Sequence, residues 1–352
     1  MHIIIGSPSY TAAVMNMKRL GFVLVFGLLL LAAVFHAQVG GSLLAAGERC
    51  VMILVPSLYC YSIIAALAVW GGLIGSGRAS VVAVVVLSQL GGYPLGAQLV
   101  TGMYRSGSIT DAEAKKMLCV CIGCGPGFLL GTVCGRMPAA ARLWMMLSVS
   151  LPQLFAALLL LRGICPAERS TQPLRGAKLL TGSVETAARA MLRICSMVMA
   201  MAGGMAILEG MGVVCLTASL HPAAPAFLRT LLEVSCITEW TAQGGSLPMA
   251  AALLSFGGIC VHLQIASLSD GLLPWLQFWA VRILCSLAAY GLCWMGMPLV
   301  CRELQAVSLD VTSHIPHGTQ GWLPGACLLL MSVLLLYRGN RVCGHIRQNQ
   351  PE

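Results

Sequence analysis

The sequence predicts an all-α polytopic membrane protein with about eight transmembrane helices and additional re-entrant or broken helices. Of its 352 residues, 58% are hydrophobic and only 9% are charged, whereas soluble domains are about 45–50% apolar and about 25% charged. The apolar residues also gather into runs of membrane-spanning length, with short polar connections between them. These runs are 20–40, 50–74, 79–101, 117–136, 142–162, 187–214, 247–268, 272–299 and 322–338. We therefore expect a multi-pass protein of the cell membrane.

The basic residues orient these segments. Most of the net charge of +9 lies in short connections, at 18–19, 105–116, 162–178 and 338–347. Such clusters mark cytoplasmic loops, and no separate basic domain is present to bind nucleic acid. The loops at 105–116 and 162–178 stay on one side only if segment 79–101 enters the membrane and turns back. The expected topology is eight crossings plus one re-entrant element.

The polar connections divide the chain into two membrane halves. The apolar run after Arg19 lacks the small residues of a signal cleavage site, so it is predicted to remain as the first span. The predicted parts are an N-terminal cytoplasmic segment (1–19, with residues 1–16 preceding a second candidate start, Met17), a first half (20–162), a polar cytoplasmic linker (163–186), a second half (187–340) and a basic tail (341–352).

Glycine and proline interrupt three of the apolar segments, at 91–96, 123–127 and 257–264. The stretches GGYPLGAQL (91–99) and GGICVHLQI (257–265) share Gly-Gly, five residues, then Gln and an aliphatic residue. We interpret them as parts of two weakly similar, inverted repeats. Paired interruptions at corresponding positions of two halves point to a transporter site.

The interruptions predict a binding element within the membrane. Pro94 cannot continue a helix hydrogen-bond ladder, and Gly92 tolerates the dihedral angles of a break. The amides of the helix that restarts there must face protein, water or a ligand. Gln98 would project one turn further along the same face as Pro94. The alternative is a structural kink whose backbone groups are satisfied by neighbouring helices.

Ionisable and polar residues in apolar segments are further candidates. Glu233 precedes the interruption at 257–264, and Glu209 lies near the end of segment 187–214. An ionisable group at membrane depth is costly and therefore a functional candidate. His262 and Gln264 can share a helix face only if the backbone is broken between them. The 16 cysteines lie mostly in apolar runs, and the cluster Cys119–Cys124 has no matching ligand pair, so we expect no metal and no cofactor.

Several motifs, in order, carry a resemblance to a known family. They are SQLGGYPLGAQLVTG (88–102), GCGPGFLLG (123–131), LLEVS (231–235) and LLSFGGICVHLQIAS (253–267). Between about residues 50 and 300, the chain resembles the nucleoside-recognition, or Gate-domain, family. Its YlbJ-type members are sporulation integral membrane proteins, and it is related to concentrative nucleoside transporters. The resemblance implies broken helices around a polar site in the membrane.

We therefore expect a transporter or permease-like protein for a small polar solute such as a nucleoside, embedded in the lipid bilayer, with a homo-oligomer as a further expectation. The candidate substrate-binding residues are Gly92, Tyr93, Pro94, Gln98, Gly125, Pro126, Glu233, His262 and Gln264. The alternative is a non-transporting membrane factor required for spore envelope (cortex or coat) formation. This alternative is favoured by the loss of polar residues that the family has at three places. This chain has Gly91, Ile122–Cys124 and Cys236–Ile237 there. The protein is not expected to be an enzyme, because no H-E-x-x-H, G-x-S-x-G or P-loop motif occurs.

Overall fold

The computed structural model describes residues 22–304, apart from residues 24, 73, 75, 76, 135, 136, 138, 168–173 and 220. Within this part of the chain all regular structure is helical. Among the described residues, four helical stretches are long and apolar enough to cross a membrane: Ala139–Leu160, Gly176–Gly210, Leu247–Leu268 and Trp275–Pro298. The predicted class, an all-helical membrane protein, is thus confirmed. The count of eight crossings stays a prediction, and the segment 322–338 lies outside the described residues.

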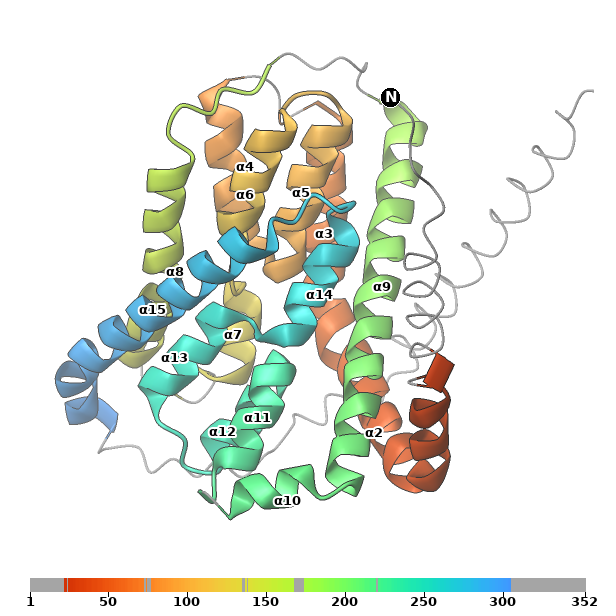
Figure 1. Ribbon diagram of the computed structural model, residues 1–352. Helices are drawn as coiled ribbons and strands as arrows, with labels where there is room; N and C mark the ends of the chain where they lie inside the picture. Colours follow the sequence, from red (N-terminus) through yellow and green to blue (C-terminus); the bar gives the residue numbers. More distant parts are fainter. Residues whose placement is uncertain are drawn as a thin grey trace, which may run out of the picture.

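The helices follow one another with few long connections (Figure 1). In order they are α2 (His36–Arg49), η1 (Cys50–Leu54), α3 (Val55–Trp70), α4 (Arg78–Gly91), α5 (Tyr93–Arg105), α6 (Asp111–Val120), α7 (Pro126–Thr132), α8 (Ala139–Leu160), α9 (Gly176–Gly210), α10 (Val213–Ala218), α11 (Ala224–Leu232), η2 (Val234–Cys236), α12 (Ile237–Ala242), α13 (Leu247–Phe256), α14 (Gly258–Leu268) and α15 (Trp275–Leu304).

The N-terminal part differs from the sequence prediction. Segment 20–40 is not one straight span, because the helix Val25–Val34 and the helix starting at His36 are bent by 92°. The predicted connection at 41–49 is instead α2, which continues through the π-helical turn η1 into α3. The Leu and Ala residues of this segment favour a helix, and they outweigh the cost of its glycines, about 1 kcal/mol each. Ala46 is buried in the cluster that α2 forms with α9.

The helices α4 and α5 form a first hairpin with its tip at Gly92. They pack side by side. Gly77, before α4, donates its N–H to the Pro166 carbonyl, and Ser108, after α5, accepts from the Ala167 N–H, both at 2.9 Å. The two open ends of the hairpin therefore lie together, and the predicted reversal within segment 79–101 is present.

A second hairpin is formed by α11 and α12. The Phe227 and Trp240 rings are 5.9 Å apart, and Arg229 Nη1 donates to Glu239 Oε2 at 3.2 Å. Because residue 227 contacts residue 240 and residue 229 contacts residue 239, the two helices run antiparallel. The tip of the hairpin lies near Glu233. Figure 1 shows this hairpin at the lower end of the molecule and the α4–α5 hairpin at the upper end.

Each hairpin is followed by an interrupted helix. The first, α6–α7, begins with the capping box of Thr110 and Glu113 and is broken between Val120 and Pro126. The second, α13–α14, is broken only at Gly257, with φ +93°. The matched Gly-Gly pairs of the predicted repeat therefore occupy different elements, a hairpin tip and an interrupted helix. The similarity of 91–99 to 257–265 therefore links two different kinds of element, and the repeat stays a prediction.

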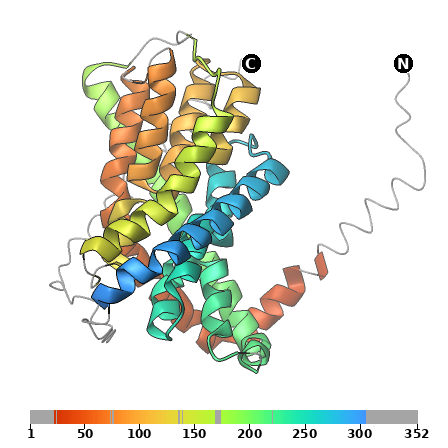
Figure 2. The same ribbon diagram turned by 90° about the vertical axis from the view of Figure 1, so that its left-hand side faces the viewer.

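Three long helices complete the bundle. The helix α9 packs on α2 and α3, while α15 runs obliquely across the bundle against α8 and α13 (Figures 1 and 2). Helix α9 begins at Gly176, inside the predicted linker 163–186, so the linker ends earlier than expected. The reason is a packing contact, because Leu179 lies against Gly71 beyond the end of α3.

Candidate functional site

The backbone at the tip of the first hairpin lies directly against the backbone at the break of the first interrupted helix. A Cβ atom on Gly125 would lie 3.0 Å from the Gly92 nitrogen and 3.2 Å from the Leu90 carbonyl oxygen. Gly92 has φ +85° and ψ 178°, angles that essentially only glycine adopts. We call the meeting point of Gly92, Tyr93, Gly125, Gly257 and Gly258 the central junction. Two predicted breaks thus come together in space.

Proline starts a helix on each side of this contact. Pro94 lies in the first turn of α5, and Pro126 is the first residue of α7. Because the first turn of a helix has no acceptor for its N–H groups, proline is tolerated there. The prediction that a new half-helix starts near Pro94 is confirmed, although the helix already begins at Tyr93.

Tyr93 connects the first hairpin to the second half of the chain. Its hydroxyl donates to the Leu254 carbonyl of α13 at 2.5 Å. A Cβ atom on Gly257 would lie 3.2 Å from the Tyr93 ring. The break at Gly257 leaves α13 carbonyls without their usual helical donors, and the buried tyrosine hydroxyl supplies one.

The tip of the second hairpin meets the break of the second interrupted helix. A Cβ atom on Gly258 would lie 3.0 Å from the Val234 nitrogen. Beside it, Glu233 is only 7% exposed, and its Oε1 accepts from the Ser235 N–H at 3.2 Å. Its Oε2 is buried with no hydrogen-bond partner among the described residues. A carboxylate oxygen is therefore left at the tip to bind a proton, a cation or a solute donor.

The predicted glutamines lie on helices that pack against each other. Gln98 is on α5 and Gln264 on α14. Both amide atoms of Gln98 are buried without a partner in the described part of the chain. Within the described part of the chain, Gln264 Nε2 donates to the Cys260 sulfur, at 3.3 Å. Amides in this state are available to a polar ligand, because an unmade buried hydrogen bond is costly.

His262 has a packing role that the sequence prediction did not include. It lies in the regular helix α14, so the interruption does not extend to residue 264 as predicted. The ring is 4.6 Å from Phe256 and 5.0 Å from Phe278. Its Nε2 is 2.9 Å from the Phe256 carbonyl, whereas Nδ1 has no partner among the described residues. His262 therefore packs against the C-terminal end of α13. It does not share a helix face with Gln264.

Arg282 is a buried candidate residue that the sequence analysis did not single out. It lies on α15, is 0% exposed, and donates to three backbone carbonyls of other helices or their ends. Its Cζ is also 5.9 Å from the Phe278 ring centroid. A lone arginine inside the apolar segment 272–299 was the available signal, because an intramembrane charge is a functional candidate by default.

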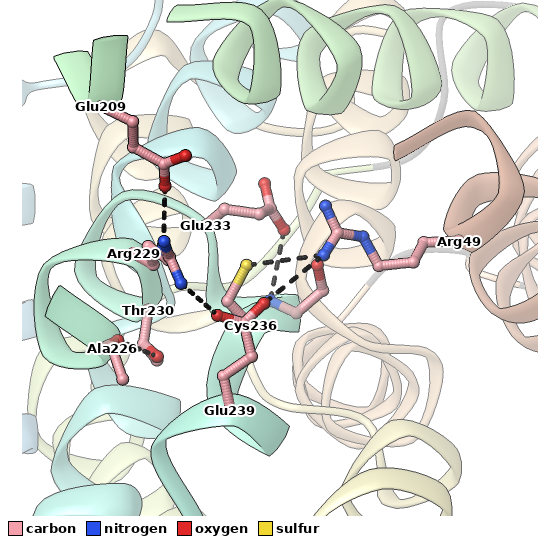
Figure 3. A network of polar contacts seen from close by, with 9 residues as sticks. Arg49, Glu209, Ala226, Arg229, Thr230, Glu233, Cys236 and Glu239 are labelled. Atoms are coloured by element: carbon pink, nitrogen blue, oxygen red, sulfur yellow. Dashed lines mark hydrogen bonds and ion pairs between the residues drawn. The ribbon is translucent and has the colours of Figure 1, made fainter. Parts of the chain in front are cut away.

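An ionic network holds the second hairpin to the helices beside it (Figure 3). Arg229 Nε donates to Glu209 Oε1 at 2.7 Å, and its Nη1 donates to Glu239 Oε2. Arg49 Nη1 is 4.0 Å from Glu239 Oε1 and 3.7 Å from the Cys236 sulfur. Glu209 thus pairs with Arg229 of the second hairpin, and the network joins α2, α9, α11 and α12.

We expect Arg229→Gln to lower the stability of the protein by about 1 kcal/mol at low salt, because two carboxylates lose the cation between them. The expected loss of stability is modest because the ion pairs are partly exposed. The difference should shrink at high salt. Thermal unfolding in detergent at two ionic strengths measures it. Arg189→Gln, which removes an exposed pair with Glu185 within one helix, is the control. Equal melting of Arg229→Gln and the parent at low salt would contradict a stabilising network.

The described residues do not bring together three His, Cys, Asp or Glu side chains that could hold a metal ion. The described cysteines are all free, including Cys119, Cys121 and Cys124 at the first break. The candidate site is consequently built from amides, one carboxylate, one hydroxyl and helix ends.

No family model, no curated protein and no solved structure matches the chain. The fold and the site define the class of the protein, a helical membrane protein with helices broken in its core.

Proposed function

We propose that the protein is a transporter or permease-like protein of the cell membrane for a small polar solute, of the nucleoside-recognition type. The observation that carries this proposal is the convergence of two hairpin tips and two helix breaks at one buried place. Irregular backbone at membrane depth is tolerated only where it is buried in protein or lines a cavity. Transporters use such broken helices to bind solutes and ions near the bilayer midplane.

The order of elements supports an inverted repeat. A hairpin followed by an interrupted helix occurs as α4–α7 and again as α11–α14. The two hairpins enter from opposite ends of the molecule (Figure 1). This pairing joins whole elements and does not depend on the Gly-Gly stretches. In many transporters, one such repeat moves against the other around a central site.

The basic residues support an orientation for the repeat. The open end of the first hairpin lies beside Pro166 and Ala167. Exposed or partly exposed basic residues gather around this end of the bundle: Arg78, Arg105, Lys115, Lys116, Arg162, Arg175 and Lys178. By the positive-inside bias this end is cytoplasmic, so the first hairpin enters from the cytoplasm and the second from outside.

The solute would be recognised mainly by neutral hydrogen-bonding groups. Gln98 and Gln264 offer donors and acceptors, and Glu233 offers a carboxylate oxygen. The Tyr93 hydroxyl, which donates to Leu254, is left to accept. Such a set suits a solute with several hydroxyl, amide or ring-nitrogen groups. No catalytic step is part of this proposal.

The test is ligand-dependent thermal stabilisation of the detergent-purified protein across nucleosides, nucleobases and small anionic metabolites. A single-site ligand at 100 times its Kd should stabilise the protein by about 2.7 kcal/mol. We expect one class to raise the melting temperature, and we expect Gln98→Ala combined with Gln264→Ala to abolish that shift. Gln243→Ala, at an exposed position after α12, is the matched control and should keep the shift.

A non-transporting membrane factor for spore envelope formation is the second candidate. It is favoured by the apolar residues at the first break, where Ile122 and Cys124 are buried in the main hydrophobic core. No stabilisation by any compound of the panel, with the double variant melting like the parent, would support this candidate and contradict transport of these solutes.

A further inference from the structure

Arg282 carries a buried positive charge without a carboxylate partner. No Asp or Glu of the described part of the chain lies within ion-pair distance of it, and the side chain is 0% exposed. Removing an ion from water is expensive, and the cost persists unless other groups stabilise the charge. The structure must therefore stabilise this guanidinium by other means.

The broken ends of two helices do so. Arg282 Nη1 donates to the Ile122 carbonyl at 3.0 Å and to the Ser255 carbonyl at 3.3 Å, while Nη2 donates to the Cys119 carbonyl at 3.4 Å. Helix α6 ends at Val120 and α13 ends at Phe256. The last carbonyls of a helix lack donors and carry its negative partial charge. The guanidinium thus supplies hydrogen-bond donors to the carbonyls that each interruption leaves unpaired.

These contacts join the two halves of the chain. Cys119 and Ile122 precede the first break at Gly125, whereas Ser255 precedes the second break at Gly257. One planar guanidinium reaches both ends at once, and a compact ammonium would lack its fork of donors. The breaks that Arg282 holds are the ones that contact Gly92 and Tyr93 in the central junction.

We propose that Arg282 is the positioning residue of the central junction: it holds the C-terminal ends of α6 and α13 side by side and keeps the junction closed. Without it, the segment 121–125 and the Gly257 break separate while the rest of the bundle stays folded. That the closed junction is the solute-bound or occluded form rests on the proposed function.

Native cysteines report on this opening. Cys121 and Cys124 lie in the segment after α6 and are buried, as are Cys50 and Cys195 between η1 and α9. The purified protein is treated with N-ethylmaleimide, and alkylation of each cysteine is followed by peptide mass spectrometry. In Arg282→Gln, we expect Cys121 and Cys124 to react about tenfold faster or more, since charge-assisted hydrogen bonds are lost. Cys50 and Cys195 should react at the parental rate.

Two further variants sharpen the result. Arg193→Gln removes another arginine that donates to a carbonyl near a helix end, that of Ser267 at 3.2 Å, but at an exposed site. It should label like the parent. Arg282→Lys keeps the charge without the fork, so it should show the same selective acceleration with a smaller factor. If Arg282→Gln does not fold, Arg282→Lys decides the question.

Unchanged labelling of Cys121 and Cys124, or equal acceleration of all four cysteines, would overturn the proposal, because the second pattern means general destabilisation. The labelling requires no solute. A failed ligand panel with selective labelling would contradict the proposed function alone, and a successful panel without selective labelling would contradict the role of Arg282 alone.

Discussion

Gly96→Ala should lower the stability of the protein by about 3 kcal/mol or more, a large effect for one added methyl group. The new Cβ would lie 1.5 Å from the Cys121 carbonyl oxygen and 3.0 Å from the Ser88 Cβ. The closest obstacle is backbone, so no side chain can rotate away. Helix α5 would have to move from the segment that follows α6. Thermal unfolding in detergent, followed with a thiol-reactive dye, measures the loss.

Gly204→Ala in α9 is the matched control. It places the same methyl group in a helix with no atom within 4 Å of the new Cβ. Alanine is a better helix former than glycine by about 1 kcal/mol, so this variant should melt at or above the parent temperature. If Gly96→Ala melts no lower than Gly204→Ala, the close approach of α5 to Cys121 does not exist.

Tyr93→Phe should cost about 1–3 kcal/mol, because the buried Leu254 carbonyl loses its donor and remains out of contact with water. The ring itself is retained, so packing against Gly257 is unchanged. The same unfolding measurement applies. The hydroxyl joins residues 161 positions apart in the chain, so its loss loosens the contact between the two halves.

Tyr104→Phe provides the comparison for this second variant. Tyr104 lies on the same helix and is 37% exposed, so losing its hydroxyl should change the melting temperature little. Equal melting temperatures for the two variants would show that the Tyr93 hydroxyl makes no stabilising bond at the junction.

Local signals in the sequence located the interruptions well. Gly92 with Pro94, Gly125 with Pro126, and Gly257 with Gly258 each predict a break because glycine and proline change what the backbone can do at their own positions. The start of α6 depends on an equally local contact, the capping box of Thr110 and Glu113. The reversal of segment 79–101 followed from charge, since the basic connections had to remain on one side.

The errors arose where packing overrides local preference. The glycines of 41–49 resemble a connection, but they remain helical because α2 packs against α9. Gly176 and the polar residues after it resemble a linker, but Leu179 packs on Gly71. The stretches 91–99 and 257–265 are similar because both contain a glycine with positive φ at a break. A hairpin tip and an interrupted helix both require such a glycine.

By itself, the sequence determined that this is an all-helical membrane protein with breaks at particular glycines and prolines, because apolar composition and backbone freedom are properties of single residues and short segments. Only the tertiary structure decided what satisfies the broken ends. Arg282 reaches Ile122 across 160 positions and Tyr93 reaches Leu254 across 161. The acceptors are backbone carbonyls, which every residue carries, so no side-chain pattern marks them. Their donors can be identified only when the helices are packed together.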